Sequence, residues 1–389
     1  MRPRPVLSLL LAGACATLLA ACGSGGTTAP AAPAAPRAPA GGPLDLAGVC
    51  PATVVLQQDW QPEAEHGPMY SVVGPNYTVD TGTKSVTGPL VTQGQDTGVK
   101  VQVRSGGPNT GFQPVPALMY LDPAITLGAV NTDDAIVSAA KGQRTVAVTA
   151  QMTVSPQILM WDPTSHPGLT TLRQVAATGV TVLTSGEILP ALLEQQGLIT
   201  KAQSDPSYDS SPQRFVSDPR ILQQGFATAE PYIYQHEIAQ WRKPVAWEPL
   251  AHYGYSIYPE PLAVRADKLA ELTPCLTKLV PIMQRAEVDY QHNPGPTNAL
   301  IVQLVGAYQT GWTYTAADAD YSARTQISGG FVTNDPASGV FGKFDPARMH
   351  DTVTRFAPLL AATGTMTGPA PSPESLYTNQ FIDNSVRMP

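Results

Sequence analysis

Apolar and polar residues alternate along the chain with two different periods. The segments KVQVR (100–104) and RTVAVTAQ (144–151) change between apolar and polar at every second residue, which predicts strands. Between them, NTDDAIVSAAKG (131–142) starts with residues that cap helices and ends at Gly142, a residue typical of a helix C-terminus. This part of the chain therefore predicts a strand, a helix and a second strand in succession.

The same order of elements continues farther along. TTLRQVAATG (170–179) predicts a helix, VTVL (180–183) a buried strand, and TSGEILPALLEQQG (184–197) a loop followed by another helix. Because proline is favoured in the first turn, further helix starts are predicted at Pro231, Pro274 and Pro346. Alternating strands and helices predict α/β lobes with mostly parallel sheets, in which ligands bind where strands end and helices begin.

The first residues have the pattern of a secretory signal. Basic residues precede the apolar stretch 6–20, which is too short to cross a bilayer with about 30 Å of hydrocarbon. The residues LAAC (19–22) resemble a bacterial lipobox. We therefore predict a signal peptide over 1–21, cleavage before Cys22 and a lipid on the sulfur of Cys22. An ordinary signal peptide cut near Ala21 is the alternative.

Residues 22–45 follow with a composition dominated by Ala, Pro and Gly. Such a tract cannot bury a core and predicts an extended tether. A lipid at one end and a spacer behind it predict a folded body attached to a membrane only through its anchor.

The cysteines agree with an extracytoplasmic location. Cys15 leaves with the signal peptide and Cys22 carries the lipid, so Cys50 and Cys275 remain in the mature chain. Two cysteines in an oxidising environment usually pair. We predict a disulfide between them, and two separately buried thiols are the alternative.

Size and charge narrow the class of protein. About 340 residues follow the tether, which is more than one core usually contains, so two lobes are expected. Charged residues make up 14% of the chain and the formal net charge is −7. Without a basic patch, nucleic acid is not an expected partner.

Three segments come close to catalytic motifs without completing them. HEIAQ (236–240) has Gln240 where a zinc metalloprotease helix has its second His. GYSIY (254–258) lacks the final Gly of a serine-hydrolase turn, and GVFGK (339–343) is too short for a phosphate loop. The sequence therefore favours ligand binding without catalysis.

The loop LQQDWQPEAEHGPMY (56–70) concentrates polar and aromatic groups after a predicted strand. It holds Asp59, Trp60, Glu63, Glu65 and His66. A metal site would need further donors, and the six histidines of the chain are not clustered. No metal or other cofactor is therefore predicted, although distant histidines could still converge in space.

The start of the mature chain is similar to a known family. VVLQQDWQPEAEHGPMYSV (54–72) resembles the opening of substrate-binding proteins of ABC importers for nitrate, sulfonates and thiamine-pyrimidine precursors. The matching residues are Asp59, Trp60, Pro62, His66, Gly67 and Tyr70. Weaker similarity covers most of residues 52–290. The segment 71–98 departs from the family, because its many Gly, Thr and Pro residues do not form a clean helix.

The resemblance implies a two-lobed periplasmic-binding-protein-like fold of type II, with a ligand cleft between the lobes. Residues 46–150 and 256–389 would form lobe 1, and residues 151–255 would form lobe 2. The two segments that cross between the lobes, near residues 150 and 255, would act as the hinge. The implied partners are a small-molecule ligand and the permease and ATPase subunits of an ABC importer, with the receptor itself a monomer.

The residue types suggest a planar nitrogen heterocycle, first of all an aminopyrimidine of thiamine salvage. Such a ring would stack on Trp60 and on a facing Tyr, while carboxylates accept hydrogen bonds from its amine. The expected ligand-binding residues are Asp59, Trp60, His66, Tyr70, Asp133, Thr184, Ser185, Gly186, Glu230, Tyr232 and Tyr255.

Several alternatives stay open. The backbone N–H groups of the 184–186 loop could instead bind an anion such as nitrate or a sulfonate. Trp60 and His66 could be core residues, and Asp133 could serve mainly as a helix cap. An enzyme that converts vitamin precursors is a further reading, but the cysteine-rich motif of such relatives is absent. The last alternative is a surface lipoprotein that binds a partner protein or a metal.

Overall fold

The computed structural model describes residues 33–389. The predicted signal peptide (1–21) and the predicted lipid attachment at Cys22 lie outside the described residues. In the described part of the chain, strands and short helices are interspersed from β1 to β12, and four longer helices follow. None of the helices in residues 33–389 is both long enough and apolar enough to cross a membrane.

Seven strands form the first sheet, in the order β2-β3-β4-β1-β5-β12-β6. Their bounds are β1 (Thr53–Gln57), β2 (Thr78–Asp80), β3 (Ser85–Thr92), β4 (Gln95–Arg104), β5 (Ile125–Ala129), β6 (Thr145–Thr149) and β12 (Leu262–Arg265). Strand β1 runs parallel to β4 and β5, whereas β12 runs antiparallel to β5 and β6. The predicted strands at 100–104 and 144–151 are β4 and β6.

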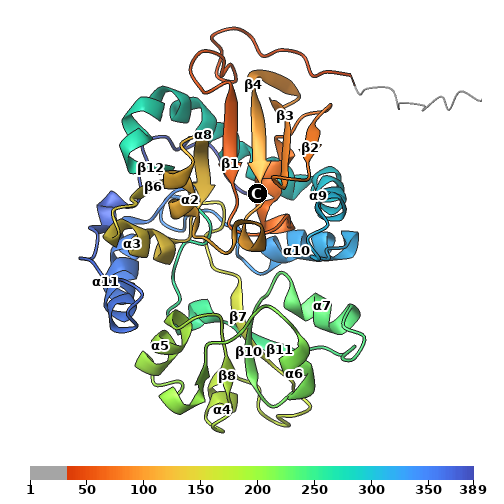
Figure 1. The fold of residues 1–389 in the computed structure, drawn as a ribbon, viewed down its shortest axis with the longest axis vertical. Helices are drawn as coiled ribbons and strands as arrows, with labels where there is room; N and C mark the ends of the chain where they lie inside the picture. The colour runs from red at the N-terminus through yellow and green to blue at the C-terminus, as the bar shows by residue number, and fades with distance from the viewer. Residues whose placement is uncertain (1–32) are drawn as a thin grey trace, which may run out of the picture. The chain divides into compact units, whose positions relative to one another are not determined.

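Five strands form the second sheet, in the order β11-β7-β10-β8-β9. They are β7 (Gln157–Trp161), β8 (Val182–Leu183), β9 (Ser204–Asp205), β10 (Leu222–Phe226) and β11 (Ala246–Pro249). Strands β8, β9 and β10 pair in parallel, while β7 pairs antiparallel with both β10 and β11. The chain enters this sheet after β6 and returns to the first sheet at β12 (Figure 1).

The sheets are mixed, so the prediction of mostly parallel sheets was wrong. One cause is the segment 71–98, which contains β2 and most of a β3–β4 hairpin. Gln93 and Gly94 turn this hairpin with φ angles of 50° and 72°. Two consecutive residues with positive φ suit a two-residue turn whose twist matches that of the strands.

Eleven α-helices occur in the described residues. They are α1 (Gly67–Ser71), α2 (Val115–Leu121), α3 (Thr132–Ala140), α4 (Leu172–Ala176), α5 (Ile188–Gln195), α6 (Gln213–Ser217), α7 (Glu230–His236), α8 (Leu269–His292), α9 (Gly295–Tyr308), α10 (Ala316–Ser328) and α11 (Pro346–Ala362). Pro231 and Pro346 lie in first turns as predicted, but Pro274 lies inside α8, which begins five residues earlier.

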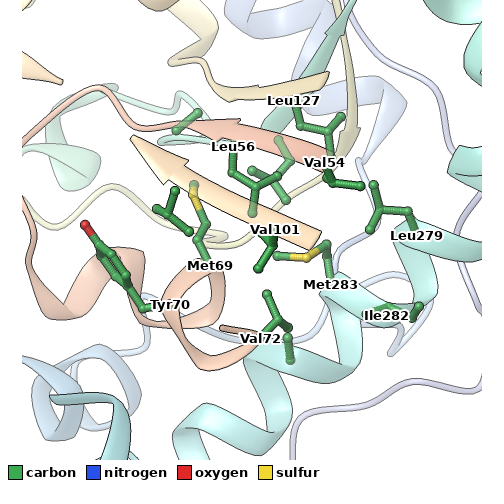
Figure 2. Close-up of a cluster of buried hydrophobic side chains, with 14 of the residues drawn as sticks. Val54, Leu56, Met69, Tyr70, Val72, Val101, Leu127, Leu279, Ile282 and Met283 are labelled. Atoms are coloured by element: carbon green, nitrogen blue, oxygen red, sulfur yellow. The ribbon is translucent and has the colours of Figure 1, made fainter. Parts of the chain in front are cut away.

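Strand β1 is buried on both faces. Val55 points to a cluster that includes residues of α3 and α11. On the opposite face, strands of the first sheet pack against α1 and α8, through Val54, Leu56, Met69, Tyr70, Val72, Val101, Leu127, Leu279, Ile282 and Met283 (Figure 2). Burial of each large apolar side chain contributes about 1.5–3 kcal/mol, so this layer fixes the strand ends that carry the polar loops.

Cys50 and Cys275 are joined by a disulfide, which links the residues before β1 to α8. The residues just before Cys50 are also part of the folded body. The guanidinium of Arg37 donates to the carbonyl oxygen of Asp96 on β4 at 2.9 Å, and Leu46 is fully buried. The predicted tether (22–45) is therefore too long, because its last residues find backbone partners along β4.

Candidate ligand-binding site

Three polar residues meet at one edge of the first sheet. Asp59 follows β1 and Asn131 follows β5, and these parallel strands end at the same edge. Glu260 precedes β12, whose antiparallel direction brings its first residues to that edge as well. The amide of Asn131 donates to Asp59 Oδ2 at 3.1 Å, and the backbone N–H of Glu260 donates to Asn131 Oδ1 at 3.1 Å.

His66 lies at the centre of this group. It ends the short 3₁₀ turn Ala64–His66, and its side chain is completely buried. Its Nε2 lies 3.0 Å from Asp59 Oδ1 and 3.1 Å from Glu260 Oε2. Burial alone would lower the pKa of His66, but the charges of Glu260 and Asp59 outweigh it and raise the pKa well above its ordinary value.

Two more carboxylates of the same loop stand beside this group. Burial, followed by the charge of Glu65, raises the pKa of Glu63 well above its ordinary value. Burial raises the pKa of Glu65 as well, and it raises that of Glu260 to about 7. In the part of the chain that the structure describes, no Lys or Arg forms an ion pair with Asp59 or with these three glutamates. The site is therefore acidic, with His66 as its one basic partner.

The second sheet contributes a further carboxylate. Glu230 begins α7 and accepts the backbone N–H of Phe226 at 2.6 Å. Burial is the main reason that its pKa rises to about 7, and the charge of Glu65 adds to the effect. Two residues farther along, Tyr232 lies against His236 and against Tyr321 of α10, with ring centroids 4.6 and 5.2 Å apart.

A chain of polar side chains connects the two sheets. The hydroxyl of Tyr255 donates to Asp133 Oδ2 at 3.1 Å, and Gln157 Nε2 donates to that hydroxyl at 3.4 Å. Gln224 Nε2 donates in turn to Gln157 Oε1 at 3.1 Å, and the N–H of Ser185 donates to Gln224 Oε1 at 2.8 Å. Asp133, Tyr255 and the 184–186 loop therefore belong to one network.

The 184–186 loop has no free backbone donor. The N–H of Thr184 donates to Asp205 at 2.9 Å and that of Gly186 to Pro206 at 3.3 Å, while Ser185 donates to Gln224. An anion could bind these groups only by displacing all three partners. The geometry thus gives no support to the anion role considered for this loop.

The aromatic residues are arranged differently from the prediction. The described ring neighbours of half-buried Trp60 are Phe112 and Trp312, at centroid distances of 5.9 and 6.4 Å. Tyr70 is 1% exposed, lies in the core next to α8, and donates its hydroxyl to Gln58 Oε1 at 2.9 Å. None of the three predicted tyrosines is among these ring neighbours of Trp60. Tyr70 bonds to Gln58, Tyr232 lies beside Tyr321, and Tyr255 lies beside Phe356.

Sequence reasoning missed several residues of this region. Glu260 is separated from His66 by about half of the chain, and the pairing of β12 with β5 brings the two together. In the sequence its one distinguishing feature is that Glu260 stands between two prolines, and in the structure it has a φ of 51°, which is uncommon outside glycine. Gln157 and Gln224 gave no such signal.

Comparison with known proteins identifies the fold. No known protein family and no curated protein matches the sequence. Among solved structures, the periplasmic aliphatic sulphonate binding protein of Escherichia coli matches with a TM-score of 0.51 and 11% identity, over 86% of this chain and 94% of that one. The fold is that of the periplasmic binding proteins.

Two further binding proteins match over similar lengths. The zinc-bound ligand-binding component of an ABC-type import system from Staphylococcus aureus has a TM-score of 0.50 and 12% identity, over 85% of this chain and 97% of that one. The alkanesulfonate-binding protein of Xanthomonas axonopodis pv. citri, bound to MOPS, has a TM-score of 0.50 and 11% identity, over 84% and 99%. At these identities the likeness concerns the two-lobed α/β architecture.

Proposed function

We propose that this chain is the extracytoplasmic solute receptor of an ABC importer and that its ligand is a small planar nitrogen heterocycle, first of all an aminopyrimidine of thiamine salvage. The proposal includes a lipid anchor at Cys22, a permease and an ATPase as partners, and no enzymatic activity. It also includes closure of lobe 1 (46–150 and 256–389) on lobe 2 (151–255) around the ligand.

The acidity of the site carries this proposal. Asp59, Glu63, Glu65 and Glu260 gather at one sheet edge, and Glu230 stands on the side of the second sheet. An anion next to these groups would be repelled by each carboxyl that is ionised, and no Lys or Arg among the described residues pairs with them to offset its charge. A ligand with amine N–H groups or a positive charge would instead supply the donors that carboxylates accept.

The surrounding rings support a flat ligand. Trp60 is only half buried and has its indole beside Trp312, and Tyr232 is half exposed beside Tyr321. Stacking on such a ring contributes about 0.5–1.5 kcal/mol beyond the area buried. An aminopyrimidine combines a ring face with an exocyclic amine, and therefore suits both features of the site.

The binding test is calorimetry of the purified chain in a chelating buffer against aminopyrimidines, nitrate, taurine and alkanesulfonates. We expect an aminopyrimidine to bind best, with an affinity that changes little with salt because no ion pair with an anion forms. Closure would reduce the radius of gyration in X-ray scattering when this ligand is added.

Two variants sharpen this test. Trp60→Ala should weaken the heterocycle by about 1–3 kcal/mol, the range found for bases stacked on aromatic side chains. Trp247→Ala removes another half-buried Trp, on β11, and should leave the affinity unchanged. If the best ligand is a salt-sensitive anion whose affinity survives Trp60→Ala, the heterocycle proposal is wrong.

A further inference from the structure

We propose that Asp59, His66 and Glu260 form a binding site for one divalent transition-metal ion. Nothing in the proposed uptake of a heterocycle requires this ion, which would bind to two of the carboxylates assigned to that ligand, Asp59 and Glu260. It starts from the arrangement of three donor atoms, one on each side chain, that lie within 4.8 Å of one another.

The spacing of these atoms suits a metal. Around an ion with bonds of about 2.1 Å, neighbouring ligands of an octahedron stand about 3.0 Å apart. The distances from His66 Nε2 are 3.0 Å to Asp59 Oδ1 and 3.1 Å to Glu260 Oε2. Small movements of the carboxylates would therefore bring all three atoms to bonding distance, with further positions left open for water or another ligand.

Without a bound cation, the group of Asp59, His66 and Glu260 has too little positive charge for its two carboxylates. Nε2 carries at most one hydrogen, yet two carboxylates converge on it, and His66 is the ion-pair partner of both. The buried imidazole is aimed between them, and its Nδ1 has no partner among the described residues. A dication at Nε2 would satisfy both carboxylates at once.

Neighbouring groups hold the donors in place. Asn131 donates to Asp59 Oδ2 and accepts the backbone N–H of Glu260, so it ties the two carboxylate-bearing segments together. Because Oδ2 of Asp59 is engaged, Oδ1 is the oxygen that faces His66. Such outer contacts orient metal ligands and raise metal affinity.

The donor set indicates which ions fit. One imidazole nitrogen and two carboxylate oxygens suit Zn²⁺, Mn²⁺ and similar first-row ions. Calcium takes six to eight oxygens at longer distances, and magnesium is bound mainly through oxygen and water. With side-chain exposures of 21% for Asp59 and 10% for Glu260, an ion can reach the site from solvent.

The test is equilibrium dialysis of the chelator-treated full chain against ZnCl₂ and MnCl₂, with metal content measured by mass spectrometry. We expect one ion per chain for at least one of the two metals. Glu260→Gln and Asp59→Asn should each weaken binding at least ten-fold. Glu287→Gln removes a buried carboxylate of α8 that lies outside the group and should bind metal like the unchanged chain.

Folding of the variants can be checked separately. Glu260→Gln leaves the contact between Asp59 and His66 in place. The circular dichroism spectrum and melting temperature of this variant should therefore be close to those of Glu287→Gln. The absence of a stoichiometric ion in the unchanged chain would overturn the proposal, as would binding that Glu260→Gln and Asp59→Asn leave intact. Neither result bears on the heterocycle, whose affinity is measured with chelator present.

Discussion

Glu287 is a buried carboxyl group without an ionic partner among the described residues. It lies on α8 with 2% exposure and accepts one hydrogen bond, from Gln291 Nε2 at 3.0 Å. Burial raises the pKa of Glu287 to about 8. Near neutral pH this residue is therefore largely a protonated acid in the folded chain, while in the unfolded chain it is ionised.

This difference predicts how stability depends on pH. A carboxyl whose pKa is raised on folding favours the folded state at low pH, and that contribution is lost as pH rises through about 8. Glu287→Gln should abolish this part of the decline, which amounts to at most about 1.4 kcal/mol per pH unit. Urea unfolding at pH 5 and pH 9 measures it.

A control on the same helix isolates the effect. Glu271 is exposed near the start of α8, and Glu271→Gln should keep the pH dependence of the unchanged chain. Equal pH dependence in Glu287→Gln and the unchanged chain would contradict the assignment of a raised pKa to Glu287.

At the scale of elements, α1 packs tightly against α8 at Gly67. A Cβ on Gly67 would lie 2.2 Å from the ring of Tyr290. That ring cannot move freely, because it is 1% exposed and its hydroxyl donates to Asn298 Oδ1 at 2.9 Å. The small residue after His66 is therefore needed for the packing that positions the site loop.

Gly67→Ala should destabilise the chain by about 1–3 kcal/mol, the usual cost of overpacking a core. Chemical denaturation followed by fluorescence gives the value. Gly295→Ala is the matched control, since a Cβ at the first position of α9 meets nothing within 4 Å. A Gly67→Ala variant as stable as the control would show that α1 and α8 can separate without cost.

The elements also show how far sequence reasoning reached. Strands β4 and β6 and the starts of α7 and α11 followed from alternation and from proline in the first turn. The β2–β3 region did not, because its Gly and Thr residues carry no helical period and only weak strand alternation. At the site, Asp59 and His66 are neighbours on one loop and could be proposed, whereas Glu260 depends on an antiparallel pairing that no local pattern encodes.

At the scale of the whole molecule, the predicted anchor decides where the protein works. LAAC (19–22) and the Ala/Pro/Gly tract behind it predict a lipid on Cys22. Cells fed a clickable fatty acid should label the unchanged protein, and Cys22→Ser should abolish the label. Cys15→Ser, a change within the predicted signal peptide, should leave it intact. A mature chain that starts elsewhere and carries no lipid would refute the anchor.

The link between Cys50 and Cys275 has a mechanical consequence for such an anchored protein. A force applied through the membrane anchor would act first on the N-terminal residues. It would break the hydrogen bonds between the 36–46 segment and β4, and would then act on Cys50. There the covalent bond diverts the load into α8 before it reaches β1, which lies between β4 and β5 in the first sheet. In a chain anchored as predicted, the strand that leads to Asp59 and His66 would thus be protected from tension, and the candidate site would stay folded under a pull on the N-terminal residues.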